Sequence, residues 1–429
     1  MSRESPREIA MRVLRRRRVS REYVEMLLEQ ELARAGLSKL DRALCQELVY
    51  GLVRWEMTLD WLIARKTSAR RQEGVVQMLL RLGLYQIFWL ERIPAHAAVH
   101  ETVELGRRLG CGAQTGFINA VLRGYLRERE ATVRELEGLK REEPALGYSH
   151  PAWLVKRWEG RWGPEKTARL LEWDNSPPPT FARLNLLKTD AATLTGLWEA
   201  EGIGFAARRW DWTEENEVFE LESHPSLAEW SDFQRGLFYI QDPSTLLAVR
   251  ELDPQPGENI LDLCAAPGGK TAQMAQRMGN RGHILAHDPQ PARLRRLVEN
   301  CARLGAGCVE ATASNPGGGG PFDRILVDAP CSNSGVLRRR VDLRWRISEE
   351  ELKRLGREQG AMLREAAAHL KPGGRLVYST CSLEPEENEE VTREFMREQS
   401  EFTLESQRQL LPFAEEVDGA WVAALRRRG

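Results

Sequence analysis

Long hydrophobic runs are missing from this sequence. No apolar run reaches the roughly 18 residues that a membrane-spanning helix needs. The first residues, MSRESPREIAMRVLRRRRVS, are rich in charge but contain no apolar stretch, so they do not have the form of a secretory signal. With 42% hydrophobic and 29% charged residues, the composition is that of a globular protein, for which we expect no membrane partner.

Paired cysteines are also missing. The chain has seven cysteines, an odd number, and no two of them have the CxxC spacing. This argues against both a disulfide framework and a structural zinc site. No histidine lies near Cys331 or Cys381 in the sequence, and two thiols do not complete a zinc shell, so we expect no metal. A reducing cytoplasm fits this pattern, and any special cysteine there would be a reactive thiol.

A strong net charge is absent as well, because the whole chain carries −1. The charge is unevenly distributed: residues 1–140 contain 25 Lys and Arg against 18 Asp and Glu, a net +7. A basic N-terminal part on a near-neutral chain suggests a polyanion such as nucleic acid as partner, although a solvated helical surface would look the same. For the run RRRR at 15–18 the solvated helix face is the favoured interpretation.

With 429 residues, the chain is long enough for two or three domains. Residues 1–140 show helical spacing of apolar residues, as in YVEMLLEQELARAG and VVQMLLRLGLYQIFWLERI, and predict an all-helical bundle. Residues 141–235 are rich in Pro and Trp and include one strand-like stretch, TFARLNLL, which predicts a small α+β connector domain. Residues 236–429 form the third predicted domain.

Strands and helices alternate in this third part. The predicted strands are ENILDLC, GHILAHD, GCVEAT, DRILVDA and RLVYST, and the predicted helices are TAQMAQRM, PARLRRLVENCARLG and EEELKRLGREQGAMLREAAAHL. Such alternation with short turns predicts an α/β fold with a parallel, doubly wound sheet.

Two turns in this domain suggest a ligand site. In LDLCAAPGGKTAQM, 261–274, Gly268 and Gly269 follow a strand and open a helix, so a ligand can approach the backbone there. The pattern is neither GxGxxG nor a Walker A loop, and a plain structural turn is the alternative. Asp288 ends the next strand, where an acid can hold two ribose hydroxyls; the alternative is a helix N-cap.

Two further strands each end at a cysteine. In ILVDAPCSNSG, Asp328 closes an apolar strand and Ala-Pro holds Cys331 in a tight turn followed by the polar residues 332–335. In RLVYSTCSLEPEENEE, Cys381 follows the next predicted strand. Carboxyl ends of parallel strands form one ligand-binding edge, so the two thiols and the acid are expected to converge, and a thiolate nucleophile is indicated. The alternative is two unrelated buried cysteines.

LDLCAAPGGKT, DAPCSNSG and YSTCSLEPEENE resemble the signature motifs of the RNA 5-methylcytosine methyltransferases of the NOL1/NOP2/Sun family. GLFYIQDPSTLLAV, 236–249, resembles the segment that precedes the cofactor loop there, and RIPAHAAVHETVELGRR with FINAVLRGYL resembles a NusB-like RNA-binding domain. This combination is similar to the members of the family that act on bacterial 16S ribosomal RNA.

The resemblance implies a Rossmann-like class I methyltransferase domain that uses S-adenosyl-L-methionine. Cys381 would be the nucleophile, Cys331 would assist product release, and Asp328 would lie near both cofactor and target base. A single-stranded loop of 16S ribosomal RNA, free or in an early ribosomal particle, would be the substrate of a monomeric enzyme. The cofactor-binding residues would be Cys264, Ala265, Ala266, Pro267, Gly268, Gly269, Lys270, Asp288, Arg293 and Asp328.

One stretch departs from the family pattern. The family has an acid after the third strand that contacts adenine, whereas VEATASNPGGGG has Ala313 or Ser314 there and an unusual glycine run at 317–320. Three other functions remain open: a transfer RNA cytosine methyltransferase, an amino-group methyltransferase, and a non-catalytic RNA-binding assembly factor. The NusB-like part argues against the first. Cys331 in place of the Pro-Tyr of an Asp-Pro-Pro-Tyr motif argues against the second, and retention of both cysteines argues against the third.

Overall fold

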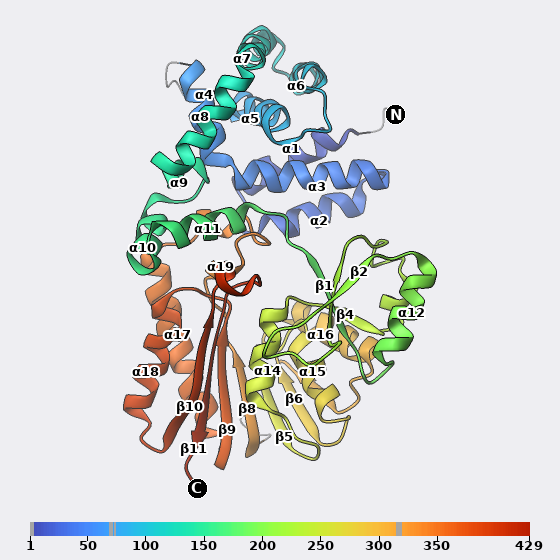
Figure 1. Cartoon of the computed structure of the whole chain (residues 1–429), viewed down its shortest axis with the longest axis vertical. Coiled ribbons are helices and arrows are strands. Elements are labelled where there is room, and N and C mark those ends of the chain that lie inside the picture. Colours follow the sequence, from blue (N-terminus) through green and yellow to red (C-terminus); the bar gives the residue numbers. More distant parts are fainter. Residues whose placement is uncertain (1–3, 68–71, 73, 315–319) are drawn as a thin grey trace. The chain divides into compact units, whose positions relative to one another are not determined.

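A computed structural model gives the fold of the chain (Figure 1). It describes residues 4–67, 72, 74–314 and 320–429. The chain divides into two compact units. The helical unit comprises Met1–Ser176 together with Leu337–Arg346, and the sheet unit comprises Pro177–Val336 and Ile347–Gly429. Within the described ranges, no helix is long and apolar enough to cross a membrane.

The helical unit confirms the all-helical interpretation of the N-terminal part. Its first helix starts sharply because Ser5 and Glu8 form a capping box and Pro6 occupies the first turn. Apolar side chains spaced three and four residues apart face one core, to which α5 contributes most along its length. The helices are α1 Pro6–Arg17, α2 Val24–Arg34, α3 Lys39–Arg54, α4 Glu56–Lys66, α5 Gly74–Trp89, α6 Ala95–Arg108, α7 Thr115–Arg127, α8 Arg129–Glu142, α9 Pro144–Gly147, α10 Ala152–Trp162 and α11 Pro164–Asn175.

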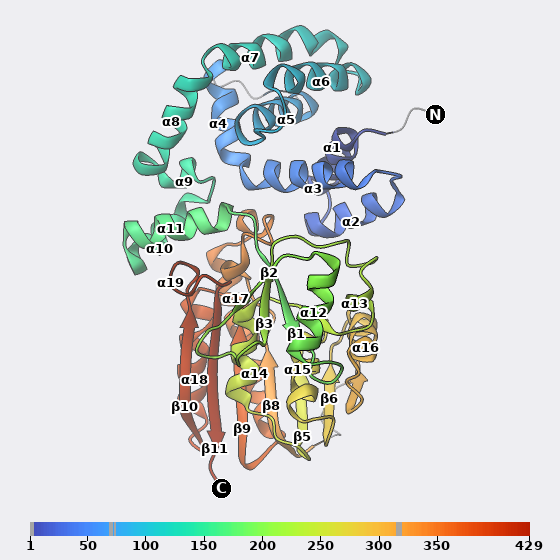
Figure 2. The same cartoon turned by 45° about the vertical axis from the view of Figure 1, so that its right-hand side comes forward.

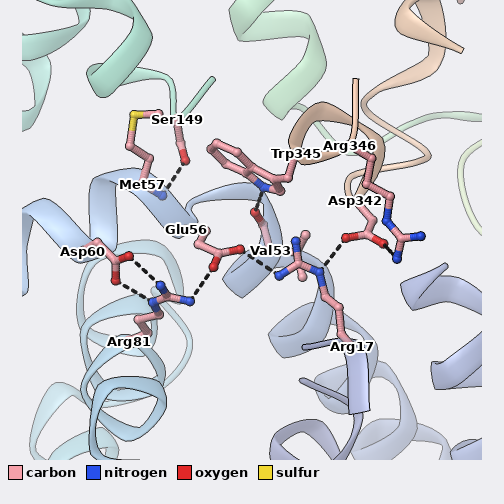
Figure 3. A network of polar contacts seen from close by, with 10 residues as sticks. All are labelled: Arg17, Val53, Glu56, Met57, Asp60, Arg81, Ser149, Asp342, Trp345 and Arg346. Carbon is pink, nitrogen blue, oxygen red and sulfur yellow. Dashed lines mark hydrogen bonds and ion pairs between the residues drawn. The ribbon is translucent and has the colours of Figure 1, made fainter. Parts of the chain in front are cut away.

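Residues 337–346 belong to the helical unit although the sheet unit flanks them on both sides in sequence. Figure 3 shows how they are held. Asp342, only 1% exposed, accepts a 2.5 Å hydrogen bond from Arg17 of α1 and lies 2.6 Å from a guanidinium nitrogen of Arg346. The indole N–H of Trp345 donates to the carbonyl of Val53 at 2.8 Å. We call residues 337–346 the inserted segment.

The same network continues into α4 and α5. Arg17 also binds Glu56 at 2.8 Å, and Glu56 binds Arg81 at 2.7 Å, which in turn holds Asp60 (Figure 3). Burial alone would raise the pKa of Glu56, but the charges of Arg81 and Arg17 hold it below its usual range. A chain of alternating charges thus links the inserted segment to three helices of the bundle.

The sheet unit contains two sheets (Figure 2). The smaller is antiparallel, with the order β2-β3-β1-β4, and carries α12 (Ala191–Glu201) and α13 (Ser231–Gln234) in its connections. Its strands are β1 Thr180–Leu184, β2 Phe205–Arg208, β3 Val218–Leu221 and β4 Phe238–Ile240. Trp198 and Trp230 pack with its inner face, so the Trp-rich composition of this region serves a core of its own. The predicted strand TFARLNLL is β1, which ends at Leu184.

The larger sheet has the order β10-β11-β9-β8-β5-β6-β7. All five strands predicted from the alternating pattern are present and parallel to one another. Apolar side chains of α14, α15 and α16 cover one face, and those of α17 and α18 cover the other, as a doubly wound fold requires. The strands are β5 Asn259–Leu263, β6 His283–His287, β7 Val309–Thr312, β8 Phe322–Asp328, β9 Leu370–Thr380, β10 Phe402–Leu410 and β11 Ala420–Arg427; the helices are α14 Leu246–Leu252, α15 Gly269–Arg277, α16 Pro291–Leu304, α17 Glu349–Ala368 and α18 Glu389–Glu398.

The sheet differs from the expected parallel one at its edge. β11 runs antiparallel to both β9 and β10, so the sheet is mixed. Only a short connection with the one-turn helix α19 (Pro412–Glu415) separates β10 from β11, and such a link can join antiparallel neighbours only. β10 is buried only at its two ends, Phe402 and Leu410, and this mostly polar edge strand was not recognised in the sequence.

The buried ion pair of the inserted segment can be tested directly. We expect Asp342→Asn to destabilise the helical unit by about 2–4 kcal/mol, because it leaves the half-buried Arg17 short of a partner. Asp211→Asn is the matched control: its pair with Arg408 has nearly the same length, 2.6 Å, but is exposed, and should be worth less than about 1 kcal/mol. Urea unfolding gives the loss, and hydrogen exchange should locate it in 337–346 and α1. Equal losses in the two variants would contradict the analysis.

Candidate active site

The carboxyl ends of four neighbouring strands define one edge of the larger sheet. Strand register places Leu263 of β5 opposite both His287 of β6 and Val327 of β8, and Asp328 of β8 opposite Ser379 of β9. The chain leaves these strands at the four stretches that the sequence had singled out. The structure therefore brings all of the predicted site residues to one edge, where ligands bind in open α/β sheets.

The loop after β5 turns tightly into α15. Cys264 and Gly268 both have positive φ, of 62° and 97°. The backbone N–H of Ala265 donates to the carbonyl of His287, and that of Gly268 to Ala265, at 2.9 and 2.8 Å. Gly269 begins α15, so the first N–H groups of that helix have no acceptor within it. A chain path whose N–H groups lack an acceptor in the helix, and which has no bulky side chain, suits close approach of a ligand.

Two residues outside the predicted set support this loop. The guanidinium of Arg183 in β1, 1% exposed, donates to the Gly269 carbonyl at 2.9 Å and to Gln241 at 2.5 Å. A Cβ at Gly269 would lie 2.7 Å from the Tyr239 ring, which explains why glycine is needed there. Burial lowers the pKa of Arg183 to about 10. An arginine inside the largely apolar stretch TFARLNLL was the signal that could have pointed to it.

Asp288 lies beside this loop and is fully buried. Its Oδ1 accepts from the N–H of Gln290 at 3.0 Å, while Oδ2 makes no hydrogen bond to any residue that the structure describes. Arg293 lies 3.3 Å from that Oδ2 and donates to the Ala266 carbonyl at 2.7 Å. Gln290, not Asp288, is the N-cap of α16, so the N-cap alternative does not account for Asp288. A buried carboxylate oxygen without a hydrogen bond fits the two donors of a ribose diol.

An ion pair joins the glycine loop after β5 to the neighbouring strand β8. Lys270 donates to Oδ2 of Asp328 at 2.7 Å, and Ser379 donates to Oδ1 at 2.8 Å. Burial alone would lower the pKa of Lys270, but the charge of Asp328 and the hydrogen bond raise it above its usual value. Asp262, in the middle of β5, is 1% exposed and accepts from Thr271 at 2.6 Å; burial raises its pKa to about 7. Asp262 was missed, although an acid inside ILDLC is a visible signal.

The two cysteines are in contact. Sγ of Cys331 lies 3.3 Å from Sγ of Cys381, and the latter thiol donates to Oδ1 of Asn333 at 3.0 Å. Asn333, with φ of 59°, also donates to the Cys331 carbonyl at 2.6 Å. The hydrogen bond with Cys381 and burial raise the pKa of Cys331 well above its usual value. Two unrelated buried cysteines would not meet in this way, so that alternative is excluded.

The remaining cysteine of the edge behaves differently. Cys264 lies 3.7 Å from the sulfur of Met362, and burial raises the pKa of its thiol to about 12. It therefore stays protonated at neutral pH. In the described part of the chain, no group of three or more His, Cys, Asp or Glu has the arrangement of a metal site.

β7 ends at Thr312, directly before the positions at which the family has its adenine-contacting acid. Ala313 and Ser314 are exposed directly after β7, and the N–H of Ser314 donates to Oγ1 of Thr312 at 3.1 Å. The Thr312 carbonyl accepts from Asp288 at 3.2 Å, so this strand end adjoins the candidate ribose site. Residues 317–319 of the glycine run lie outside the described residues.

Three family models match the chain. Residues 249–426 match the 16S rRNA methyltransferase RsmB/F, residues 4–127 the NusB family, and residues 150–213 the ferredoxin-like domain of RsmF/B-like methyltransferases. A probable ribosomal RNA small subunit methyltransferase B from Bacillus subtilis (strain 168) is 35% identical over the full length of both chains. The chain belongs to the RsmB family of RNA methyltransferases. The NusB-like bundle, the connector with a ferredoxin-like domain and the Rossmann-like methyltransferase fold are thereby confirmed.

Solved structures agree with this assignment. The protein PH0851 has a TM-score of 0.78 at 23% identity, covering 99% of each chain, and so shares the fold. NSun6 from Pyrococcus horikoshii with SFG, an analogue of S-adenosylmethionine, has a TM-score of 0.59 at 23% identity and covers 65% of this chain and 98% of its own. The cofactor of this chain is S-adenosylmethionine. The residues present fit this cofactor. The N–H groups at the start of α15, which lack an acceptor in the helix, suit its methionine carboxylate. The buried Oδ2 of Asp288 suits its ribose hydroxyls.

The exposed pair after β7 gives a test of cofactor binding. We expect Ala313→Asp or Ser314→Asp to tighten S-adenosylmethionine binding by about 1–2 kcal/mol, because a carboxylate there can accept from the adenine amino group. Isothermal titration measures the change, with Ala302→Asp on the exposed surface of α16 as control for added charge. Unchanged affinity in both Asp variants would mean that another residue already serves the adenine.

Proposed function

We propose that this protein transfers a methyl group from S-adenosylmethionine to C5 of a cytosine in 16S ribosomal RNA, through a covalent adduct on Cys381. The observation that carries the proposal is the contact between two thiols, 3.3 Å apart, at the sheet edge that also bears the glycine loop. The relatives are named as methyltransferases of the ribosomal RNA small subunit, and this supports 16S ribosomal RNA as the substrate. Neither an amino-group methyltransferase nor a pure binding protein has use for two thiols in contact.

The chemistry of cytosine explains why a thiol is needed. C5 is a poor nucleophile, and S-adenosylmethionine supplies an electrophilic methyl group that C5 takes up only when activated. The thiolate of Cys381 adds to C6, which turns C5 into an enamine-like carbon. Asp328, whose two oxygens accept from Lys270 and Ser379, is the residue to accept a hydrogen bond from N3 of the base once N3 is protonated, and so to stabilise the adduct.

The second thiol has a role after the first has reacted. Once methylated, C5 still carries a proton that must leave before Cys381 can be eliminated. The hydrogen bond with Cys381 is the largest cause of the raised pKa of Cys331. A Cys381 that has become a thioether carries no charge and is a poor acceptor for the Cys331 thiol, so the pKa of Cys331 falls as the adduct forms. Cys331 thereby becomes able to accept the C5 proton at the stage when a base is required.

The two cysteines should give mutants that differ in kind. Cys381→Ala should abolish methylation and form no covalent RNA. Cys331→Ala should still attack and methylate but release slowly, so a denaturant-stable protein–RNA complex should accumulate. The measurement is denaturing gel electrophoresis with in vitro transcribed 16S ribosomal RNA and S-adenosylmethionine. Cys45→Ala is the matched control, because that buried cysteine lies on α3 in the core of the helical unit.

Other outcomes of this experiment are equally informative. A covalent band with Cys381→Ala and none with Cys331→Ala would reverse the two roles. Full activity of both variants without any trapped RNA would overturn the thiolate mechanism. Transfer RNA in place of ribosomal RNA tests the alternative substrate in the same assay.

We also propose that the helical unit supplies RNA affinity. A groove of about 960 Å³ in this unit is lined by Arg12, Arg15, Arg16 and Arg18 among others. The run 15–18 is not uniform: Arg16 pairs with Glu31 at 2.8 Å and Arg17 serves the inserted segment, whereas Arg15 and Arg18 are exposed. The run is thus only partly the solvated helix face that the sequence favoured, and its two exposed members are the candidates for phosphate contacts.

The double variant Arg15→Glu/Arg18→Glu should weaken binding to 16S ribosomal RNA by about tenfold or more and make the affinity less dependent on salt. Binding of S-adenosylmethionine should not change. Arg134→Glu, at an exposed position of α8, is the matched control. Deleting residues 1–140 would be a poorer test, because it also removes Arg17 and Val53, which bind the inserted segment. Wild-type RNA affinity and salt slope in the double variant would exclude this surface.

A further inference from the structure

A buried carboxylate lies directly behind the thiol pair. Glu387 ends the short 3-10 helix η6 (Pro385–Glu387), which follows the Cys381 loop, and its side chain is fully buried. Its Oε1 accepts from the N–H of Ser332 at 2.8 Å and from Gln359 at 3.1 Å. Its Oε2 accepts from the hydroxyls of Ser332 and Ser382, each at 2.5 Å.

The two serines are the residues that immediately follow the two cysteines in the chain. Ser332 belongs to the loop after β8 and Ser382 to the loop after β9, and the two hydroxyls are also 3.2 Å from each other. One carboxylate therefore bridges the two Cys-Ser dipeptides through the serine hydroxyls. We propose that Glu387 is the positioning residue that fixes the spacing of Cys331 and Cys381, an inference that rests on the proposed function of the two thiols.

Glu387 is itself held in place by surrounding elements. Its carbonyl accepts from the hydroxyl of Tyr378 in β9 at 2.5 Å, and the same hydroxyl contacts Gln359 of α17 at 3.1 Å. The next residue, Asn388, accepts from Thr380 at 2.6 Å. Glu387 is thus anchored to the central strand β9 and to the long helix α17, so its position does not depend on the two cysteine loops that it binds.

The hydrogen-bond donors around Glu387 also indicate the charge state of its carboxylate. All four partners of the Glu387 carboxylate can donate, and an ionised carboxylate can only accept, so the anion satisfies every bond. Burial raises the pKa of Glu387 above its usual value, although the hydrogen bonds from Ser332 and Ser382 act in the opposite direction. The groups that interact electrostatically with the thiols are Glu387 and Tyr378 beside Cys331, and Lys270 beside Cys381. Of these, the carboxylate acts on Cys331 and favours its neutral thiol.

Phenylarsine oxide tests the spacing without RNA or cofactor. It condenses with two neighbouring thiols to a cyclic dithioarsonite and releases one water, with no redox change, so its affinity reports how well two sulfurs are placed. Wild type should bind one equivalent that is lost in Cys331→Ala and in Cys381→Ala. Glu387→Ala should weaken capture, measured by competition with 2,3-dimercaptopropanol, at least tenfold. Glu387→Gln, which keeps the shape but lacks the charge and one acceptor, should fall between.

Controls separate positioning from folding. Glu217→Gln makes the same chemical change at a buried carboxylate of the sheet unit that contacts neither thiol loop. The double variant Ser332→Ala/Ser382→Ala removes the two hydroxyl bonds and leaves Glu387 in place, so it should also weaken capture. It serves as the test if Glu387→Ala proves unstable. Thermal unfolding of each variant shows which are folded. Wild-type capture in a folded Glu387→Ala, or in both Glu387→Gln and the serine double variant, would overturn the proposal.

A second readout follows the chemistry. Because the charge of Glu387 favours the neutral thiol of Cys331, alkylation of Cys331 by iodoacetamide should shift to lower pH in Glu387→Gln, with Cys381 replaced by Ala to isolate it. An unshifted profile would contradict the electrostatic part of the proposal. In methylation assays with 16S ribosomal RNA, Glu387→Gln should lower kcat while KM stays near wild type. Absence of methylation by wild type, together with absence of trapped RNA in Cys331→Ala, would refute the proposed function, whereas arsenical capture would still decide the role of Glu387.

Discussion

The position of β8 between β5 and β9 is the constraint on which the site depends. Its backbone bonds to both neighbours fix where three strands end, and the chain must leave each strand at the same edge. The glycine loop, Asp328 with Cys331, and Cys381 are therefore neighbours by topology before any side chain is considered. Side-chain contacts then connect the three: Lys270 reaches Asp328, Ser379 reaches the same carboxylate, and Cys331 touches Cys381.

The ionisable groups at this edge of the sheet lie in different surroundings. Asp328 is held by two donors, Asp262 is buried and forms no ion pair with any residue that the structure describes, and the two thiols share one hydrogen bond. Burial raises the pKa of Asp262, and the bond to Cys381 together with burial raises the pKa of Cys331. If Glu387 acts as inferred, the asymmetry between two chemically identical thiols originates in a residue that touches neither the base nor the cofactor.

The sequence carried the central features of the fold and site because both rest on short-range patterns. Apolar strands followed by helices predicted the parallel sheet, and strand ends carrying Cys331 and Cys381 predicted their convergence. Arg183 and Glu387 were missed because each is a charged residue with partners in distant parts of the chain. Asp262 has its partner Thr271 only nine residues away, and its burial inside β5 is what the sequence did not reveal. The antiparallel edge was missed because β10 has a mostly polar sequence. Which of the four arginines at 15–18 is exposed depends on packing partners such as Asp342, far away in sequence.

The inserted segment bears on how the protein is made. The helices of the helical unit leave the ribosome first, yet the Arg17 side chain can bind Asp342, and the Val53 carbonyl can bind Trp345, only when residues 337–346 have been synthesised. Until then the bundle lacks Val341 from its core and the indole of Trp345 at its surface. The nascent helical unit must therefore wait, incompletely packed, for most of the catalytic sheet to follow, and a chain interrupted before residue 337 would leave both units unfinished.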